Sequence, residues 1–173
     1  MSNRKPKYKI IDNFLDEEAF KKIEDIVIEK EYGKFPWYYS KVIGSNYEVD
    51  NFYFSYFIHT FYNNKTVQSS YITLLEPLFK KLKIKKLIRA KINLFYPTFE
   101  LIKFDRHVDT TFPSEAAILY MNTCNGGTVL GEDTFIKSKR NKLLMFKGNI
   151  PHQSTSCTDK KFRMLININY ERN

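Results

Sequence analysis

The stretch Arg163-Met164-Leu165-Ile166-Asn167-Ile168-Asn169-Tyr170 carries an apolar side chain at every second position from Met164 onward, which predicts a β-strand with one buried face. It ends a series of short β-rich runs that begins near residue 87. The other runs cover residues 87–95, about 99–105, 115–121, 127–137, 142–147 and 151–156, with turn residues between them. A series of short strands at this spacing predicts a sandwich, a barrel or a jelly roll.

The first half of the chain predicts helices in front of that series. A strand is expected at residues 8–11, a helix from the N-cap Asp16 to Tyr32-Gly33, a loop at 34–50, a strand at 51–62, and a helix at roughly 66–83 with a kink or break at Pro77. Helices followed by strands favour an α+β fold, a mainly antiparallel jelly-roll core supported by N-terminal helices. We expect one domain over 1–173, with helical support at roughly 12–85 and the core at roughly 86–172.

Composition narrows the class of protein further. The chain has 173 residues and a formal net charge of +9, with no apolar run long enough for a membrane span and no secretory signal. Two cysteines are too few for a disulfide scaffold. We therefore expect a cytoplasmic monomer. The basic run Lys80–Lys91 is either a solvated surface or a contact for nucleic acid, the ribosome or an acidic protein.

The sequence has only three histidines, and two of them suggest a metal site. His59 stands alone in an aromatic strand and is interpreted as a core residue. His107-Val108-Asp109 would place an imidazole and a carboxylate on one face of a strand. If the fold brings His152 to the same point, the set becomes the facial triad of two histidines and one carboxylate that binds Fe(II) in non-haem oxygenases.

A charged side chain in the last strand suggests a second part of the same site. Arg163 in a β-barrel interior requires an anionic partner, and a dicarboxylate cosubstrate would supply one. The alternative is a surface ion pair with Asp or Glu. Tyr96 and Tyr120 each lie where a phenol could hydrogen-bond the same carboxylate, although core packing is the ordinary role of an isolated tyrosine.

Taken in order, these pieces resemble the 2-oxoglutarate- and Fe(II)-dependent dioxygenases of the prolyl hydroxylase type. The matching stretches are Arg89–Pro97, His107-Val108-Asp109, Ala117–Asn122, Gly126-Gly127-Thr128, Leu143–Phe146 with Pro151-His152, and Arg163. They span nearly half of the chain. One departure is that residues 110–115 lack the arginine that some peptidyl prolyl hydroxylases place there.

The resemblance implies a set of roles. His107, Asp109 and His152 would bind Fe(II), and Arg163 would bind the distal carboxylate of 2-oxoglutarate. The expected helpers and neighbours of the site are Tyr96, Tyr120, Thr128, Asn93, Asn122 and Asn169. The implied cofactors are Fe(II), 2-oxoglutarate and O2, with ascorbate as a candidate reductant.

Three functions stay open at this point. The first is hydroxylation of an unactivated C–H bond of a prolyl or other residue in a protein, with release of succinate and CO2. The second is the same chemistry on a small molecule or a free amino acid. The third is an inactive jelly-roll binding module. An open groove would favour a protein substrate, and a closed pocket would favour a metabolite.

Overall fold

Two antiparallel sheets form the architecture of the protein, which a computed structural model describes at residues 7–28, 35–40 and 55–172. Its elements are β1 (Tyr8–Ile11), α1 (Glu17–Val27), β2 (Tyr38–Ser40), β3 (Tyr56–Asn63), β4 (Thr66–Val67), the 3-10 helix η2 (Ser70–Leu75), α2 (Glu76–Leu82), β5 (Ile84–Phe95), β6 (Glu115–Tyr120), β7 (Gly127–Leu130), β8 (Thr134–Lys137), β9 (Lys142–Lys147), β10 (His152–Ser154) and β11 (Arg163–Arg172). None of the helices among these residues is long and apolar enough to cross a membrane.

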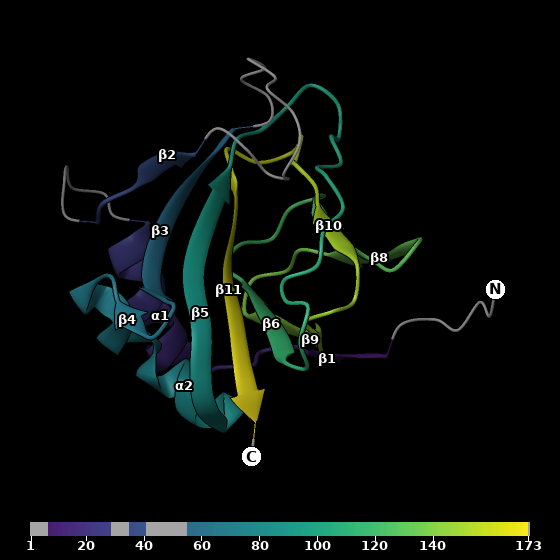
Figure 1. Ribbon diagram of the computed structural model, residues 1–173. Helices are drawn as coiled ribbons and strands as arrows, with labels where there is room; N and C mark the ends of the chain where they lie inside the picture. The colour runs from purple at the N-terminus through teal and green to yellow at the C-terminus, as the bar shows by residue number, and fades with distance from the viewer. Residues whose placement is uncertain (1–6, 29–34, 41–54, 173) are drawn as a thin grey trace.

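The larger sheet has eight strands in the order β1-β9-β6-β11-β5-β3-β2, with β4 also paired to β3, and the smaller sheet has the order β10-β7-β8. The last strand, β11, therefore lies between β5 and β6. Figure 1 shows α1 and α2 on one side of the long strands β5 and β11, and β8 and β10 on the other side. This arrangement confirms the predicted α+β fold with an antiparallel jelly-roll core. Strands β1, β2 and β3 from the first half of the chain also join the main sheet.

The two faces of the main sheet bury two different hydrophobic clusters. Alternation sends Met164, Ile166 and Ile168 of β11 into the cluster that includes the buried face of α1. Leu165 of β11 belongs to the second cluster, with Phe95 of β5 and residues of β7, β8 and β9. The second cluster lies in the jelly roll, so the odd-numbered residues of β11 face the interior between the sheets.

The start of α1 confirms the predicted N-cap. The Asp16 side chain accepts a hydrogen bond of 2.8 Å from the backbone N–H of Ala19. The helix ends at Val27, earlier than the predicted Tyr32-Gly33, which lies outside the described residues. The predicted loop at 34–50 was wrong at one point, because Tyr38–Ser40 pair with β3. The rest of that segment, 41–50, is outside the described ranges.

The second predicted helix was wrong over most of its length. Residues 66–83 form the short strand β4, the 3-10 helix η2 and only then α2, and Pro77 lies in the first turn of α2. A proline there interrupts no hydrogen bond because the first N–H groups of a helix have no intrahelical partner. Pro77 therefore lies where one helix ends and the next begins, which agrees with the predicted break.

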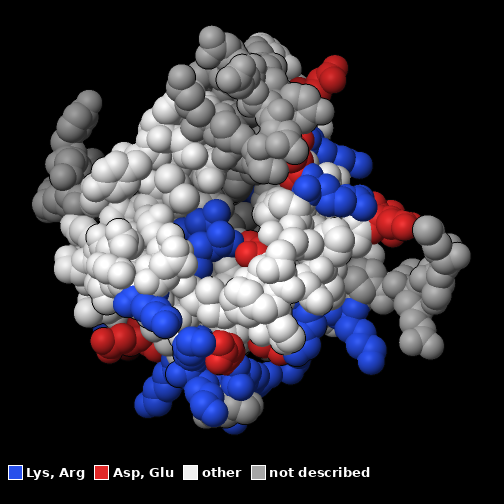
Figure 2. All heavy atoms as spheres, in the orientation of Figure 1, with Lys and Arg blue, Asp and Glu red and all other residues white. Residues whose placement is uncertain are grey.

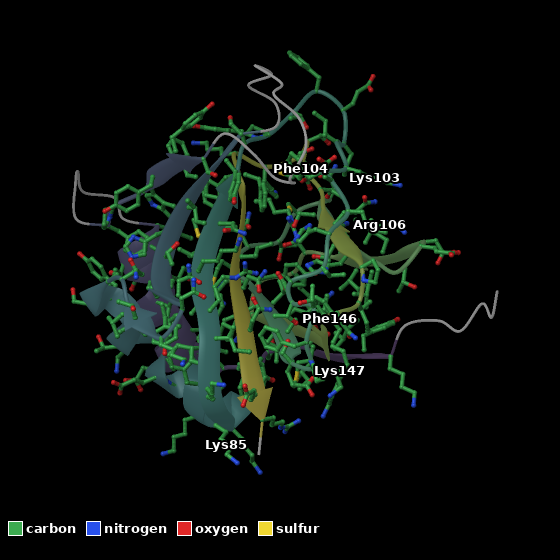
Figure 3. The ribbon with its side chains drawn as sticks, viewed as in Figure 1. Lys85, Lys103, Phe104, Arg106, Phe146 and Lys147 are labelled. Carbon is green, nitrogen blue, oxygen red and sulfur yellow. The ribbon has the colours of Figure 1, made fainter. Side chains whose placement is uncertain are left out.

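Most of the predicted β-runs are confirmed, and 142–147 matches β9 at both ends. The run 127–137 is a hairpin, β7 and β8, turned at Gly131 with a φ of 64°. The predicted strand at 99–105 was wrong. Residues 97–107 instead run beside 152–157 and form three isolated bridges, Pro97–Cys157, Lys103–Thr155 and His107–His152. Figure 3 shows Lys103, Phe104 and Arg106 along this segment next to β10.

Candidate metal centre and anion pocket

The three predicted metal ligands converge at one end of this irregular segment. His107, Asp109 and His152 each offer a ligand atom, and these atoms all lie within 4.8 Å of one another. The histidines are joined by the backbone, because the N–H of each donates to the carbonyl of the other at 2.9 Å. The prediction that His107 and Asp109 share one face of a regular strand was wrong, since only His107 is in a β-bridge.

Backbone carbonyls orient both imidazoles for metal binding. Nδ1 of His107 lies 3.1 Å from the carbonyl of Asp105, and Nδ1 of His152 lies 3.0 Å from that of Ile150. A carbonyl only accepts, so each Nδ1 carries the proton and each Nε2 keeps a free lone pair. Nε2 of His152 lies 3.6 Å from Oδ2 of Asp109. The free nitrogens and the carboxylate therefore point to a common centre.

The carboxylate of Asp109 is fully buried and held at both oxygens. Arg89 donates to Oδ1 at 2.5 Å, and the Asn169 side chain donates to Oδ2 at 3.0 Å. Nε of Arg89 also donates to the side-chain amide oxygen, Oδ1, of Asn169 at 3.1 Å, which closes a three-residue network. Burial alone would raise the pKa of Asp109, but the nearby His152 and Arg89 and the hydrogen bond from Asn169 together lower it. Asp109 is therefore anionic at neutral pH.

A glycine allows the chain to carry Asp109 to this position. The backbone N–H groups of Asp109 and Thr110 both donate to the carbonyl of Gly148. A Cβ at residue 148 would lie 2.3 Å from Oγ of Ser114 and 2.7 Å from Oγ1 of Thr110. No real Cβ approaches other atoms so closely, so only glycine fits between the two hydroxyls.

Arg89 is the site residue that sequence reasoning missed. It was counted among the seven basic residues between Lys80 and Lys91 and begins the matching stretch Arg89–Pro97, but it was given no role of its own. In the structure that run divides: Lys80, Lys81, Lys83, Lys85 and Lys86 are exposed, whereas Arg89 turns inward to Asp109. The available signal was the strand register, because Arg89 stands opposite Asn169 on β11.

We expect Arg89→Met to weaken metal binding about tenfold, because partners of metal ligands typically contribute a factor of 10–100 in affinity. Loss of the guanidinium removes one of the groups that lower the pKa of Asp109. Calorimetric titration with Mn(II) would measure the change. Lys86→Met is the matched control, since Lys86 lies on the same strand, is exposed and pairs with Glu171. Equal affinities in the Arg89 variant and in the control would contradict this role.

The burial of His152 also affects the pH below which the protein should lose metal affinity. It lowers the pKa of His152 from its ordinary value of 6.5, with Asp109 opposing the shift only in part. A proton on His152 would block the metal, so affinity falls as pH falls. We expect Mn(II) affinity to be insensitive to His152 titration between pH 8 and 7 and to decline only below 6.5. A Mn(II) affinity that already declines between pH 8 and 7, as His152 is protonated, would contradict a lowered pKa of this histidine.

Arg163 is buried completely in the jelly roll at the start of β11. Its guanidinium donates to the carbonyl of Thr155 at 3.2 Å and to Oγ1 of Thr128 at 3.3 Å, and its Nε has no partner. The predicted alternative, a surface ion pair, was wrong: among the described residues no Asp or Glu pairs with Arg163. A buried cation with neutral neighbours and a free donor fits an absent anionic ligand.

Aromatic rings and hydroxyls shape the surroundings of Arg163. The guanidinium carbon lies 5.3 Å from the ring centre of Phe95 and 5.7 Å from that of Tyr120. The Tyr120 hydroxyl donates to Oγ1 of Thr128 at 2.8 Å. A Cβ at Gly126 would lie 2.0 Å from the carbonyl of Ser156 and 3.0 Å from Cδ of Arg163, so glycine lets the backbone pass this close. The structure thus brings Tyr120 and Thr128 together with Arg163.

The other predicted site residues separate into two groups. Asn169 holds Asp109, and Asn93 is buried on the same face of β5 as Phe95. Tyr96 packs instead against Phe57, with ring centres 5.3 Å apart, and the structure does not place it with Arg163. Asn122 is bonded to the backbone of Phe162 and Met164, so it fastens the end of β6 to β11.

His59 occupies a core position, as predicted. It is buried among Phe35, Phe61 and Tyr71, and its Nδ1 lies 2.7 Å from the carbonyl of Pro36. The described structure therefore places one histidine in the aromatic core and the other two at the metal centre.

The donor set fits a hard or borderline divalent cation. Two imidazole nitrogens and one carboxylate, without thiolates, suit non-haem Fe(II) and leave coordination positions for other ligands. The unpartnered Nε of Arg163 fits a carboxylate as its ligand. Both halves of the site are therefore consistent with Fe(II) and a dicarboxylate.

Comparison with known proteins concerns the fold. No family model and no curated protein sequence matches the chain. A 2OG-Fe(II) oxygenase family oxidoreductase from Burkholderia pseudomallei is 8% identical with a TM-score of 0.70, covering 96% of this chain and 85% of that one. A prolyl-4-hydroxylase from Pseudomonas putida is 15% identical with a TM-score of 0.61, covering 96% and 94%. A non-haem alpha-ketoglutarate-dependent epimerase of nogalamycin biosynthesis is 9% identical with a TM-score of 0.66, covering 96% and 78%.

These likenesses define the fold of the chain as that of the 2-oxoglutarate/Fe(II) oxygenases. The fold expected from the resemblance to prolyl hydroxylases is thereby confirmed. The similar structures include both a prolyl hydroxylase and an enzyme of small-molecule biosynthesis, so the fold is compatible with more than one class of substrate.

Proposed function

We propose that the protein is an Fe(II)- and 2-oxoglutarate-dependent oxygenase that hydroxylates an unactivated C–H bond. The observation that carries the proposal is the coincidence of the His107–Asp109–His152 cluster with the buried, unpaired Arg163. The three clustered residues would hold Fe(II). Arg163 would bind the distal carboxylate of 2-oxoglutarate, helped by Tyr120 and Thr128. With O2, the bound iron and 2-oxoglutarate supply the oxidising power, and succinate and CO2 are released.

The residues of the chain supply orientation and shielding. Arg89 and Asn169 fix the carboxylate of Asp109, and the carbonyls of Asp105 and Ile150 keep both Nε2 atoms unprotonated. Phe95 and Tyr120 cover the guanidinium of Arg163 and exclude water from its bond to the cosubstrate. In a water-excluded pocket this charge-assisted bond is stronger than at the surface.

An anaerobic titration of 2-oxoglutarate into the Fe(II)-loaded protein tests the proposal. The chelate gives a weak visible charge-transfer band, which we expect in the wild type and not in His107→Ala. Metal binding without the band would mean that the cosubstrate is not 2-oxoglutarate. Absence of both metal binding and the band would favour the third function, an inactive jelly-roll binding module.

For the substrate, a prolyl or other residue of a protein is the first candidate and a small molecule or free amino acid is the second. Among the similar structures, the prolyl hydroxylase supports the first and the epimerase supports the second. Succinate formation with denatured proteins and peptides, compared with a panel of free amino acids, separates the two.

Several further expectations belong to the same proposal. Cys124 and Cys157 are free and buried, which is consistent with a reducing cytoplasmic setting. A single catalytic domain, a monomeric state and ascorbate as reductant are proposed with it. A contact of the exposed lysines of the basic run with nucleic acid or the ribosome also remains a proposal.

A further inference from the structure

Alternate residues of β5, three polar and one aromatic, form a row on the face of the sheet that carries the candidate metal ligands. Arg89, Lys91, Asn93 and Phe95 share this face, because successive side chains of a strand point to opposite sides. The two ends of the row are assigned by contact: Arg89 bonds to Asp109, and Phe95 packs on Arg163. The two residues between them, Lys91 and Asn93, therefore face the space between the metal ligands and the anion pocket.

The neighbouring strand adds another amide to the middle of this row. Asn167 of β11 is the direct cross-strand partner of Lys91, and directly paired residues project to the same face. Asn93 and Asn167 are 6% and 5% exposed. The structure thus places one ammonium group and two buried amides together on the interior face of the sheet.

Within the residues that the structure describes, these three side chains have no hydrogen-bond or ion-pair partner. The amide oxygens of Asn93 and Asn167 are buried without any hydrogen bond. Lys91 is partly buried, and within the described part of the chain it forms no ion pair. Burial and the nearby Arg89 lower the pKa of Lys91 to about 8, although Asp109 opposes the shift. Buried polar groups are nearly always satisfied, and at a candidate site a bound ligand is one explanation for an unsatisfied group.

This ligand differs from the proposed cosubstrate in position. The guanidinium of Arg163 turns to Thr128 and Thr155, toward the smaller sheet. Lys91 stands four residues from Phe95, the partner of Arg163, which corresponds to about 13 Å along the strand. Lys91 also lies on β5, the strand on the opposite side of β11 from Tyr120 on β6. An anion bound at Lys91 would therefore be distinct from the distal carboxylate of the cosubstrate at Arg163.

The surface view is consistent with access from solvent. Figure 2 shows a hollow in the middle of the face, with Lys or Arg atoms beside Asp or Glu atoms. This patch is separate from the cluster of exposed basic side chains at the lower edge of the same view. Lys85, labelled in Figure 3, lies at the far end of β5 and belongs to that lower edge.

We propose that the molecule oxidised at this site carries a carboxylate, which Lys91 binds with the amides of Asn93 and Asn167. The inference rests on the proposed oxygenase function and adds the chemical class of the substrate. An ammonium group and two amide N–H donors match a carboxylate, while the amide oxygens accept from a neighbouring N–H or O–H of the same molecule. Free carboxylic acids and acidic side chains of peptides share this chemistry.

Calorimetry on the full chain with Mn(II) and saturating 2-oxoglutarate tests the inference. The probes are short carboxylic acids and free L-amino acids, each compared with its primary amide, together with blocked tripeptides containing one Asp or Glu. The wild type should bind at least one acid 20-fold or more tightly than its amide. Lys91→Met should lose that preference, Lys91→Arg should keep most of it, and Lys85→Met, an exposed lysine of the same strand, should match the wild type.

The arms of the experiment separate the possible outcomes. A preference confined to free acids assigns a small molecule, and one confined to blocked peptides assigns an acidic residue of a polypeptide. The inference is overturned if no acid distinguishes wild type from Lys91→Met, or if that variant weakens 2-oxoglutarate as much as removal of Arg163 does. Failure of 2-oxoglutarate to bind the wild type would instead reject the oxygenase function. The affinities for acids and their amides would then be compared with Mn(II) as the only other ligand.

Discussion

Arg163→Met is expected to lower the affinity for 2-oxoglutarate at least 100-fold while the protein stays folded. The variant removes the buried cation that the proposed cosubstrate would pair with, and losing one partner of a desolvated charge pair costs about 2–5 kcal/mol. A factor of 100 corresponds to about 2.7 kcal/mol at 25 °C, within that range. Loss of the charge-transfer band at wild-type 2-oxoglutarate concentrations, with unchanged Mn(II) affinity, would show the effect.

The stability of the same variant provides an internal control. Arg163 is buried without an acidic partner among the described residues, so an apolar side chain of similar length removes a desolvation cost from the unliganded protein. We expect its Tm to stay within about 3 °C of the wild type, which corresponds to a change of about 1 kcal/mol in a chain of this size. Undiminished 2-oxoglutarate binding in a folded Arg163→Met protein would mean that the anchor lies elsewhere.

The second large effect is expected for His152→Ala, which should reduce Mn(II) affinity 100-fold or more. It deletes one of three clustered ligands, and this direct loss should exceed the factor of 10–100 seen for partners of ligands. The backbone bridge between residues 107 and 152 does not depend on the imidazole, so the geometry of the remaining ligands should persist. Calorimetry and the EPR signal of free Mn(II) both measure the loss.

His59→Ala is the matched control for that variant. It also removes a buried imidazole, but one that is packed among aromatic rings in the core. We expect both variants to lose about 1–3 kcal/mol of the free energy of unfolding and only His152→Ala to lose the metal. If the two variants bound Mn(II) equally well, the assignment of the metal centre would be rejected.

Much of the fold was predictable because hydrophobic alternation and turn residues are local signals. The strand at 142–147 and the N-cap at Asp16 depend on side chains within a few positions, and both are found. The helix predicted at roughly 66–83 began too early in the sequence. Its first residues pair as β4 with β3, and this contact is tertiary.

The site was predictable where residue type alone indicates the chemistry. Two histidines and one aspartate were singled out by their type and spacing, and the structure brings these three together, whereas the predicted arginine is buried in the jelly roll. It was harder to predict which face of a strand each side chain occupies. Because Phe95 faces Arg163, Tyr96 points away from it, and a shift of one residue reverses the face. Arg89 was missed because its role appears only when β5 pairs with β11.

The backbone bridges along residues 97–107 have a consequence for engineering. The segment is attached by main-chain bonds to residues 152–157, including the bond of Phe104 to Ser154 and that of Thr98 to Cys157. Its outward side chains, such as Phe99 at 95% exposed, contribute little to that attachment. Substitutions on this outer surface should therefore leave the main chain holding His107 opposite His152.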